Sequence, residues 1–149
     1  MNKRIGGLGE VAFRVNDLKR MSDFYESVIG LEVMSRNERM TFFRIAEGFA
    51  GHTQILALFD RQKGSTPDGG QLDREYTPPS AAHSSVDHIA FSIAKENFEP
   101  EVKRLQALGI KVVQNYHEWV QWRSLFIEDP EGNTVELVCY DPQSKSDLG

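Results

Sequence analysis

The two halves of this 149-residue chain follow the same order of sequence patterns. Residues 10–15 read Glu-Val-Ala-Phe-Arg-Val, and residues 88–93 read His-Ile-Ala-Phe-Ser-Ile. After each of these strand-like segments, apolar residues recur at helical spacing and stop at a glycine, Gly30 in the first half and Gly109 in the second. A shared order of strand, helix and glycine indicates a duplicated structural unit.

Three further strands complete each half. β-rich runs predict them at 31–34, 39–46 and 53–60 in the first half, and at 110–113, 122–128 and 134–141 in the second. Asn16 or Asp17 is expected to cap the first helix and Asn97 the second, and Asp129-Pro130-Glu131-Gly132 predicts a turn before the last strand. Each half is therefore expected to fold as a βαβββ module, which makes the chain an α+β protein.

We expect a single domain, with module one at 8–60 and module two at 86–141. The connector at 61–85 is rich in Gly, Pro, Ser and charged residues, and the C-terminal tail at 142–149 is expected to fray. Connectors of this length are uncommon and are often functional or mobile, although a solvated linker is the simpler interpretation.

Composition argues against several partner classes. The net charge of −5 and the pI near 5.4 argue against a nucleic-acid-binding protein, which needs a basic face. No apolar run approaches the roughly 18 residues of a membrane span, so no membrane association is expected. The single cysteine, Cys139, excludes an internal disulfide and favours a reducing, cytoplasmic setting. The expected partner is a small-molecule substrate or ligand.

Strand alternation places three potential metal ligands on the sheet face that does not meet the helices. Glu10 and His88 occupy equivalent positions in the first strand of each module, and Glu136 lies in the last strand of module two. Two carboxylates and a neutral imidazole balance a divalent cation, and oxygen and nitrogen ligands suit Mn, Fe, Co, Ni or Zn. Strand phase leaves two interpretations open, namely a metal site or three ordinary solvent-facing residues.

Several motifs carry a resemblance to a known family. Residues 86–91 read Val-Asp-His-Ile-Ala-Phe, residues 129–137 read Asp-Pro-Glu-Gly-Asn-Thr-Val-Glu-Leu, and residues 11–18 read Val-Ala-Phe-Arg-Val-Asn-Asp-Leu. Together with the repeat, these motifs resemble the vicinal oxygen chelate superfamily, which includes glyoxalase I, bleomycin-resistance proteins and extradiol dioxygenases. The resemblance implies the fold of that superfamily, in which two βαβββ modules form a cup-shaped mixed sheet around a metal or ligand pocket.

The resemblance also assigns metal-ligand positions. His88 and Glu136 match the two positions of module two in residue type. Glu10 stands at the first position of module one, where the superfamily usually has His or Gln. The implied cofactor is therefore a divalent metal held by Glu10, His88 and Glu136.

The fourth ligand position of the superfamily is not matched. Laying residues 53–60 on residues 134–141 puts Ile55 there, and an isoleucine side chain cannot bind a metal. Gln54 can replace it only if a bulge shifts the strand by one residue.

Seven further residues are expected to contact the substrate or ligand. An arginine in the first strand of glyoxalase-like relatives can hold a substrate carboxylate, and aromatic residues beside an arginine suit a planar or anionic ligand. Salt bridging or core packing is the competing interpretation for each of them. The expected ligand-binding residues are Arg14, Phe59, Tyr116, Trp119, Trp122, Arg123 and Tyr140.

Two functions of different classes fit these features. The first is a divalent-metal-dependent enzyme of lyase, isomerase or dioxygenase type, in which the metal chelates adjacent substrate oxygens and Glu10 or Glu136 moves a proton. The second is a metal-free small-molecule-binding protein of the bleomycin-resistance type, which the missing fourth ligand and the unusual Glu10 favour. The resemblance further implies a homodimer.

Overall fold

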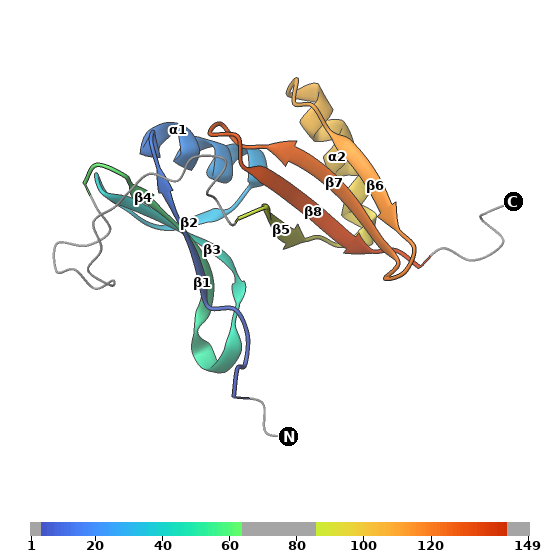
Figure 1. Ribbon diagram of the computed structural model, residues 1–149, viewed down its shortest axis with the longest axis horizontal. Helices are drawn as coiled ribbons and strands as arrows, with labels where there is room; N and C mark the ends of the chain where they lie inside the picture. Colours follow the sequence, from blue (N-terminus) through green and yellow to red (C-terminus); the bar gives the residue numbers. More distant parts are fainter. Residues whose placement is uncertain (1–3, 64–85, 143–149) are drawn as a thin grey trace, which may run out of the picture. The chain divides into compact units, whose positions relative to one another are not determined.

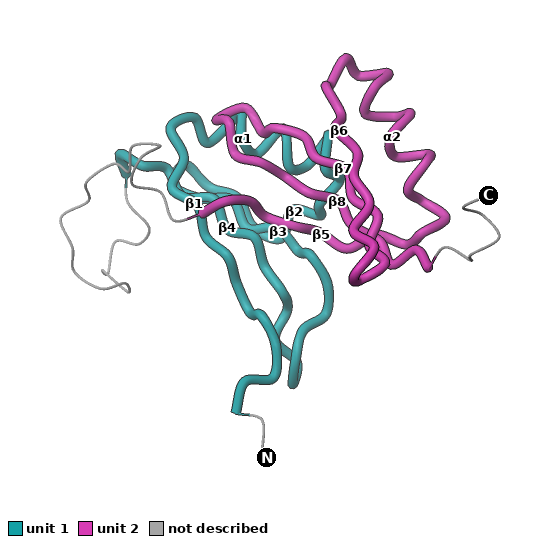
Figure 2. The backbone as a smooth tube through the Cα atoms, turned by 45° about the vertical axis from the view of Figure 1, so that its right-hand side comes forward, with its two compact units in different colours: residues 1–77 teal, residues 78–149 magenta. Residues whose placement is uncertain are grey.

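The computed structural model describes residues 4–63 and 86–142. The chain divides into two compact units, Met1–Thr77 and Pro78–Gly149, and each unit holds one copy of the repeat (Figures 1 and 2). The expected connector from residue 64 onward and the expected tail from residue 143 onward lie outside the described residues. No helix within the described ranges is long and apolar enough to cross a membrane.

Unit 1 has the expected βαβββ order (Figure 1). Its elements are β1 (Glu10–Val15), α1 (Leu18–Asp23) continued by a π-helical segment (Phe24–Ile29), β2 (Glu32–Arg36), β3 (Met40–Glu47), a short 3-10 helix (Phe49–Gly51) and β4 (Thr53–Asp60). The four strands form one mixed sheet in the order β1-β4-β3-β2, in which β1 runs parallel to β4 and the other pairs are antiparallel.

Local sequence signals set both ends of the first helix. Of the two candidate caps, Asp17 is the one used, because its Oδ1 accepts a hydrogen bond from the backbone N–H of Arg20 at 2.9 Å. Gly30 ends the helical segment with a φ of +87°, a left-handed conformation that residues with a Cβ adopt only under strain.

One face of the unit 1 sheet packs on the helix. On this face the Ser22 hydroxyl of α1 donates to the Thr41 hydroxyl of β3 at 2.8 Å, and both side chains are buried. Large apolar side chains that are fully buried in unit 1 include Met21, Tyr25, Phe43, Leu56 and Leu58. The opposite face, here called the open face of unit 1, carries Glu10 and Arg14 of β1.

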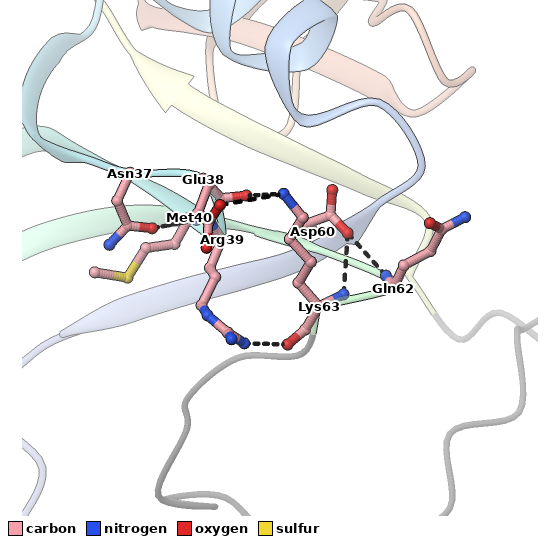
Figure 3. Close-up of polar contacts among 7 residues, drawn as sticks. All are labelled: Asn37, Glu38, Arg39, Met40, Asp60, Gln62 and Lys63. Carbon is pink, nitrogen blue, oxygen red and sulfur yellow. Dashed lines mark hydrogen bonds and ion pairs between the residues drawn. The ribbon is translucent and has the colours of Figure 1, made fainter.

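The turn between β2 and β3 is fastened to the end of β4 (Figure 3). Arg39 donates to the backbone carbonyl of Lys63 at 2.7 Å, and the Lys63 ammonium donates to the carbonyl of Glu38 at 3.2 Å. The Asp60 carboxylate accepts from the backbone N–H groups of Gln62 and Lys63, so the chain turns sharply as it leaves the sheet. These bonds hold the β2–β3 turn against the residues that follow β4.

Unit 2 repeats the βαβββ order and confirms the α+β class. Its elements are β5 (His88–Ser92), a 3-10 turn (Lys95–Asn97), α2 (Phe98–Ala107), β6 (Val113–His117), β7 (Trp122–Glu128) and β8 (Thr134–Tyr140). The sheet order is β5-β8-β7-β6, with β5 parallel to β8, and α2 lies against one face (Figure 1). The face without α2 is here called the open face of unit 2.

One boundary prediction in unit 2 is wrong, and the predicted helix cap is confirmed in its position alone. The strand expected at 110–113 begins only at Val113, because the end of α2 still uses the preceding residues: the N–H of Ile110 bonds to the carbonyl of Leu105 at 3.1 Å. Asn97 is the N-cap residue of α2, as expected, but it is also the last residue of a 3-10 turn and its side chain makes no capping hydrogen bond. The exit at Gly109 is confirmed by its φ of +74°.

The predicted turn before β8 is confirmed and is built around one buried carboxylate. Asp129 accepts from the backbone N–H groups of Glu131 and Asn133, both at 2.9 Å, and from the Asn133 side chain at 2.7 Å. The N–H of Asp129 in turn bonds to the carbonyl of Asn133. This turn fixes the start of β8, the strand that carries Glu136.

Candidate metal centre and ligand faces

His88 and Glu136 meet on the open face of unit 2. The parallel register of β5 and β8 pairs His88 with Thr134 and Ala90 with Glu136, so the two side chains are diagonal neighbours on one side of the sheet. The His88 Nε2 atom lies 3.0 Å from the Glu136 Oε2 atom. The prediction from side-chain alternation that both residues share one face is confirmed, and the register between β5 and β8 brings them into contact.

Glu136 is a buried carboxylate with a partner on each oxygen. Only 7% of the residue is exposed, although it points away from the helix. The hydroxyl of Ser124, on the neighbouring strand β7, donates to Oε1 at 2.5 Å, and Oε2 faces His88. A buried carboxylate needs such partners, because burial without them is costly. Ser124 is not among the site residues expected from the sequence; the signal that marks it is a polar residue on the Glu136 face of the adjacent strand.

The imidazole of His88 lies between two carboxylates. Its Nδ1 atom is 2.7 Å from Oδ1 of Asp87, on the side opposite Glu136. The hydrogen bond with Asp87 is the main cause that raises the pKa of His88 above its ordinary value, and the charge of Glu136 adds to it against the opposing effect of burial. In the neutral ring, a proton on Nδ1 bound to Asp87 leaves the lone pair of Nε2 for a metal or another donor.

Glu10 is the exposed first residue of β1 in unit 1. The parallel register pairs Glu10 with Ile55 and Ala12 with Ala57, as it pairs His88 with Thr134 and Ala90 with Glu136 in unit 2. The position in unit 1 that corresponds to Glu136 is thus Ala57, two residues beyond the expected Ile55. Neither side chain can bind a metal, because both are hydrocarbon.

Gln54 does not move onto the open face of unit 1. The register shift in this region lies in β3, between Arg44 and Ala46, whereas β4 pairs with β1 without interruption. Gln54 directly precedes Ile55 in an unbroken strand, so its side chain leaves the opposite face of the sheet. Gln54 could replace Ile55 only through a bulge in β4, and the bulge lies in β3.

Two expected ligand-binding residues of module one share the open face of unit 1. Arg14 of β1 and Phe59 of β4 are register partners, and Arg14 is exposed. The Phe59 ring packs edge-on against Phe42 of β3, with ring centroids 5.8 Å apart. This arrangement places a guanidinium beside an aromatic pair on the same face as Glu10.

Two aromatic residues lie at the far end of the open face of unit 2. Trp122 of β7 pairs with Tyr140 of β8, and both are exposed on the face that carries Glu136. The Tyr140 hydroxyl donates to the Gln121 side chain at 3.0 Å. Trp119, in the turn before β7, is 85% exposed. Trp122 and Tyr140 therefore form one end of the open face, and Trp119 is an exposed residue of the adjoining turn.

Arg123 and Tyr116 lie on the helix side of the unit 2 sheet, away from Trp122. The guanidinium of Arg123 lies over the Phe98 ring of α2 at 4.2 Å from its centroid and forms an ion pair with Glu99. Tyr116 is the register partner of Arg123, and its hydroxyl donates to the backbone carbonyl of Asp141. The structure therefore corrects the expectation that these two residues join the aromatic group, because Arg123 lies on the same face of β7 as Leu125 and Ile127, which are buried in the core.

The sequence matches the family model of the Glyoxalase/Bleomycin resistance protein/Dioxygenase superfamily over residues 7–137. The chain belongs to this superfamily. The match spans both repeats, and the eight strands of the described residues all begin within it, in agreement with the duplicated βαβββ architecture. The resemblance inferred from the motifs of the two modules is thereby confirmed.

Relatives within the superfamily carry several names. The chain is 28% identical to a metallothiol transferase FosB of Bacillus licheniformis, over 91% of this chain and 77% of that protein. It is 27% identical to a glutathione transferase FosA of Serratia marcescens, over 87% and 78% respectively. Among solved structures, a lactoylglutathione lyase from Agrobacterium tumefaciens matches with a TM-score of 0.61 and 30% identity, covering 92% of this chain and 96% of that one.

The residues of unit 2 fit a divalent metal of the kind that superfamily membership implies. One imidazole nitrogen and one carboxylate oxygen are ligands that Mn, Fe, Co, Ni and Zn accept. Two ligand atoms at right angles around an ion with bonds of about 2.1 Å lie about 3.0 Å apart. The His88 Nε2–Glu136 Oε2 distance of 3.0 Å suits that arrangement. Among residues 86–142, no group of three His, Cys, Asp or Glu side chains could hold a metal, so unit 2 supplies two ligands.

Proposed function

We propose that this protein is a divalent-metal-dependent enzyme that binds a small, oxygen-rich substrate through two adjacent oxygen atoms. His88, Glu136 and Glu10 are the proposed metal ligands. The observation that carries the proposal is the pair of His88 and Glu136, whose facing atoms are 3.0 Å apart while their outer atoms are held by Asp87 and Ser124. Such outer partners are typical of metal ligands, since they fix the orientation and the protonation of each donor.

The chemistry divides among a few side chains. The bound metal would act as a Lewis acid on the substrate oxygens. Glu136 is buried and engaged on both oxygens, so its role is to bind the ion. Glu10 is exposed, which leaves its carboxylate accessible to a substrate proton. Arg14, on the same strand and face, can hold a negatively charged part of the substrate.

The ligand set favours Lewis-acid chemistry over ring-opening oxygenation. Extradiol dioxygenases resemble this chain in fold but hold iron with two histidines and one carboxylate, and Glu10 occupies the position of one of those histidines. The proposed reaction is therefore of lyase or isomerase type. The similarity to proteins named metallothiol transferase and glutathione transferase adds group transfer to these candidates.

The metal content of untagged protein, purified without added metal, tests this proposal. Near-stoichiometric Mn, Fe, Co, Ni or Zn is expected in the wild type and should be lost in Glu136→Gln, which keeps the size of the side chain but removes its charge. Glu118→Gln is the matched control, because Glu118 is exposed in the turn before β7 and outside the site. Wild-type protein that holds no metal, and takes up none on titration, would contradict the proposal.

A second candidate function is binding of a small molecule without a metal. Ala57 at the position corresponding to Glu136, together with the direct pairing of His88 and Glu136, favours it, because unit 1 then supplies no ligand at that register position. A thermal-shift screen of small molecules in the presence of a chelator separates the two functions. Shifts that survive chelation support the binding protein, and shifts that require added metal support the enzyme.

The assembly state is a proposal that rests on the resemblance alone. We propose a homodimer, and sedimentation equilibrium of the full chain tests it. A single species with the mass of one chain, 16.9 kDa, would contradict this proposal.

A further inference from the structure

Ser124 is a fully buried hydroxyl that contacts the candidate metal ligand. It lies on β7, and its relative exposure is 0%. Its Oγ atom donates to Glu136 Oε1 at 2.5 Å, which is near the short limit for a hydroxyl bound to a carboxylate. Ser124 lies on the open face of the sheet, so its hydroxyl does not belong to the core between the sheet and α2. The hydrogen bond to Glu136 is the interaction that explains a serine at this position.

The strand register explains how Ser124 reaches Glu136. Ser124 pairs with Val138, while Glu136 pairs with Phe126, so Ser124 and Glu136 are diagonal neighbours on adjacent antiparallel strands. His88 approaches the same carboxylate from β5, on the other side of β8. Glu136 is thereby held between two strands, with Oε1 toward Ser124 and Oε2 toward His88.

We propose that Ser124 is a positioning residue that holds Glu136 as a single-oxygen metal ligand. This inference rests on the proposed function. With Oε1 occupied by the Ser124 hydroxyl, only Oε2 is directed to the point that His88 Nε2 also faces. Removal of the hydroxyl frees Oε1, so the carboxylate rotates away from His88 or binds the ion through both oxygens. Either change costs affinity or alters the coordination number.

The chain contains a matched control for this contact. Ser92 of β5 is the other register partner of Val138, so Ser92 and Ser124 flank that residue in the same cross-strand row of the open face. Ser92 is exposed, whereas Ser124 is buried against Glu136. Removing either hydroxyl therefore makes the same chemical change at the same level of the sheet, but only one change touches the proposed ligand.

Titration of metal-stripped protein with Co²⁺ tests the proposal, with affinity and visible absorption as two readouts. Ser124→Ala is expected to weaken Co²⁺ binding about tenfold or more, as loss of a residue that orients a metal ligand generally does. Its absorption spectrum should change in intensity, because Co²⁺ bands report coordination number. Ser92→Ala should match the wild type in both readouts.

A second pair of variants separates the hydroxyl from the packing of this buried site. Ser124→Thr and Ser124→Val have nearly the same shape, and valine carries a methyl group in place of the hydroxyl of threonine. Ser124→Thr should retain wild-type affinity, and Ser124→Val should lose about tenfold or more. This comparison decides the question even if Ser124→Ala folds poorly, because both branched side chains suit a strand.

Each outcome bears on one proposal or on both. Equal Co²⁺ binding by wild type, Ser124→Ala and Ser124→Val, together with loss of binding in Glu136→Gln, would overturn the role of Ser124 and leave the metal centre intact. Equal loss in Ser124→Thr and Ser124→Val would overturn it as well, since packing alone would then be responsible. A wild type that binds no Co²⁺, Mn²⁺, Ni²⁺ or Zn²⁺ would overturn the proposed function and this inference together.

Discussion

Replacing Arg123 by alanine is expected to destabilise unit 2 without weakening a ligand bound at its open face. The guanidinium lies 4.2 Å from the centroid of the Phe98 ring and forms an ion pair with Glu99, both on α2. It also lies 4.0 Å from the Asp141 carboxylate, which follows β8. Arg123 therefore fastens α2 to the sheet on the side opposite Glu136.

The expected loss follows from these contacts. The cation–π contact contributes about 1 kcal/mol, and the ion pair with the half-exposed Glu99 adds about 0.5 kcal/mol. The aliphatic stem of the side chain, which is mostly buried, adds about 0.8 kcal/mol for one methylene of lost burial. Asp141 keeps the Lys95 ammonium at 2.5 Å, so the larger penalty of an unpaired buried carboxylate does not arise. The total is about 2 kcal/mol.

Urea unfolding followed by tryptophan fluorescence measures this loss. The two tryptophans of the chain, Trp119 and Trp122, both lie in unit 2, so the signal reports on that unit. With a slope of about 2 kcal/mol per molar urea, the midpoint should fall by about 1 M in Arg123→Ala. The urea midpoint of Arg123→Lys should lie between those of the wild type and Arg123→Ala, because lysine keeps the charge but loses the planar stacking on the Phe98 ring.

The opposite pattern would refute this reasoning. If Arg123→Ala unfolds at the wild-type urea concentration but binds metal or ligand more weakly, the guanidinium acts at the open face and not on α2. A loss of stability together with unchanged Co²⁺ affinity is the expected result.

Two further predictions concern pH and the turn before β8. Because the pKa of His88 is raised in the folded state, protonated His88 stabilises the metal-free protein below its unfolded pKa, and this stabilisation is lost as pH rises through the folded pKa. Histidine NMR titration should show a lower His88 pKa in Asp87→Asn, and an unchanged value would contradict the role of Asp87. Asp129→Ala should cost about 2 kcal/mol in thermal unfolding, because half-buried N–H groups of the turn lose their acceptor. Asp129→Asn should lose less stability than Asp129→Ala, since its amide oxygen still accepts hydrogen bonds from the turn. Equal losses in the two variants would contradict this explanation.

The order of the elements and the faces of their residues could be predicted from the sequence. Both βαβββ modules, the cap at Asp17, the exits at Gly30 and Gly109 and the turn at 129–132 are confirmed. These features depend on neighbours a few residues apart along the chain, such as side-chain alternation, capping and left-handed glycines. Side-chain alternation in the strand also predicts that Arg123 lies on the same face as Leu125 and Ile127. The expectation that Arg123 joins the aromatic group disregarded this alternation.

Only the tertiary structure decided the registers and the contacts between strands. Comparison of the two repeats along the sequence gives Ile55 as the counterpart of Glu136, whereas the pairing of β1 with β4 gives Ala57. The contact between Ser124 and Glu136 joins residues 12 positions apart on adjacent strands, and His88 reaches Glu136 from a third. A shift by two residues keeps every side chain on the same face, so the hydrophobic pattern does not distinguish such registers. Backbone hydrogen bonding between strands does distinguish them, and it sets which polar groups lie within reach of Glu136.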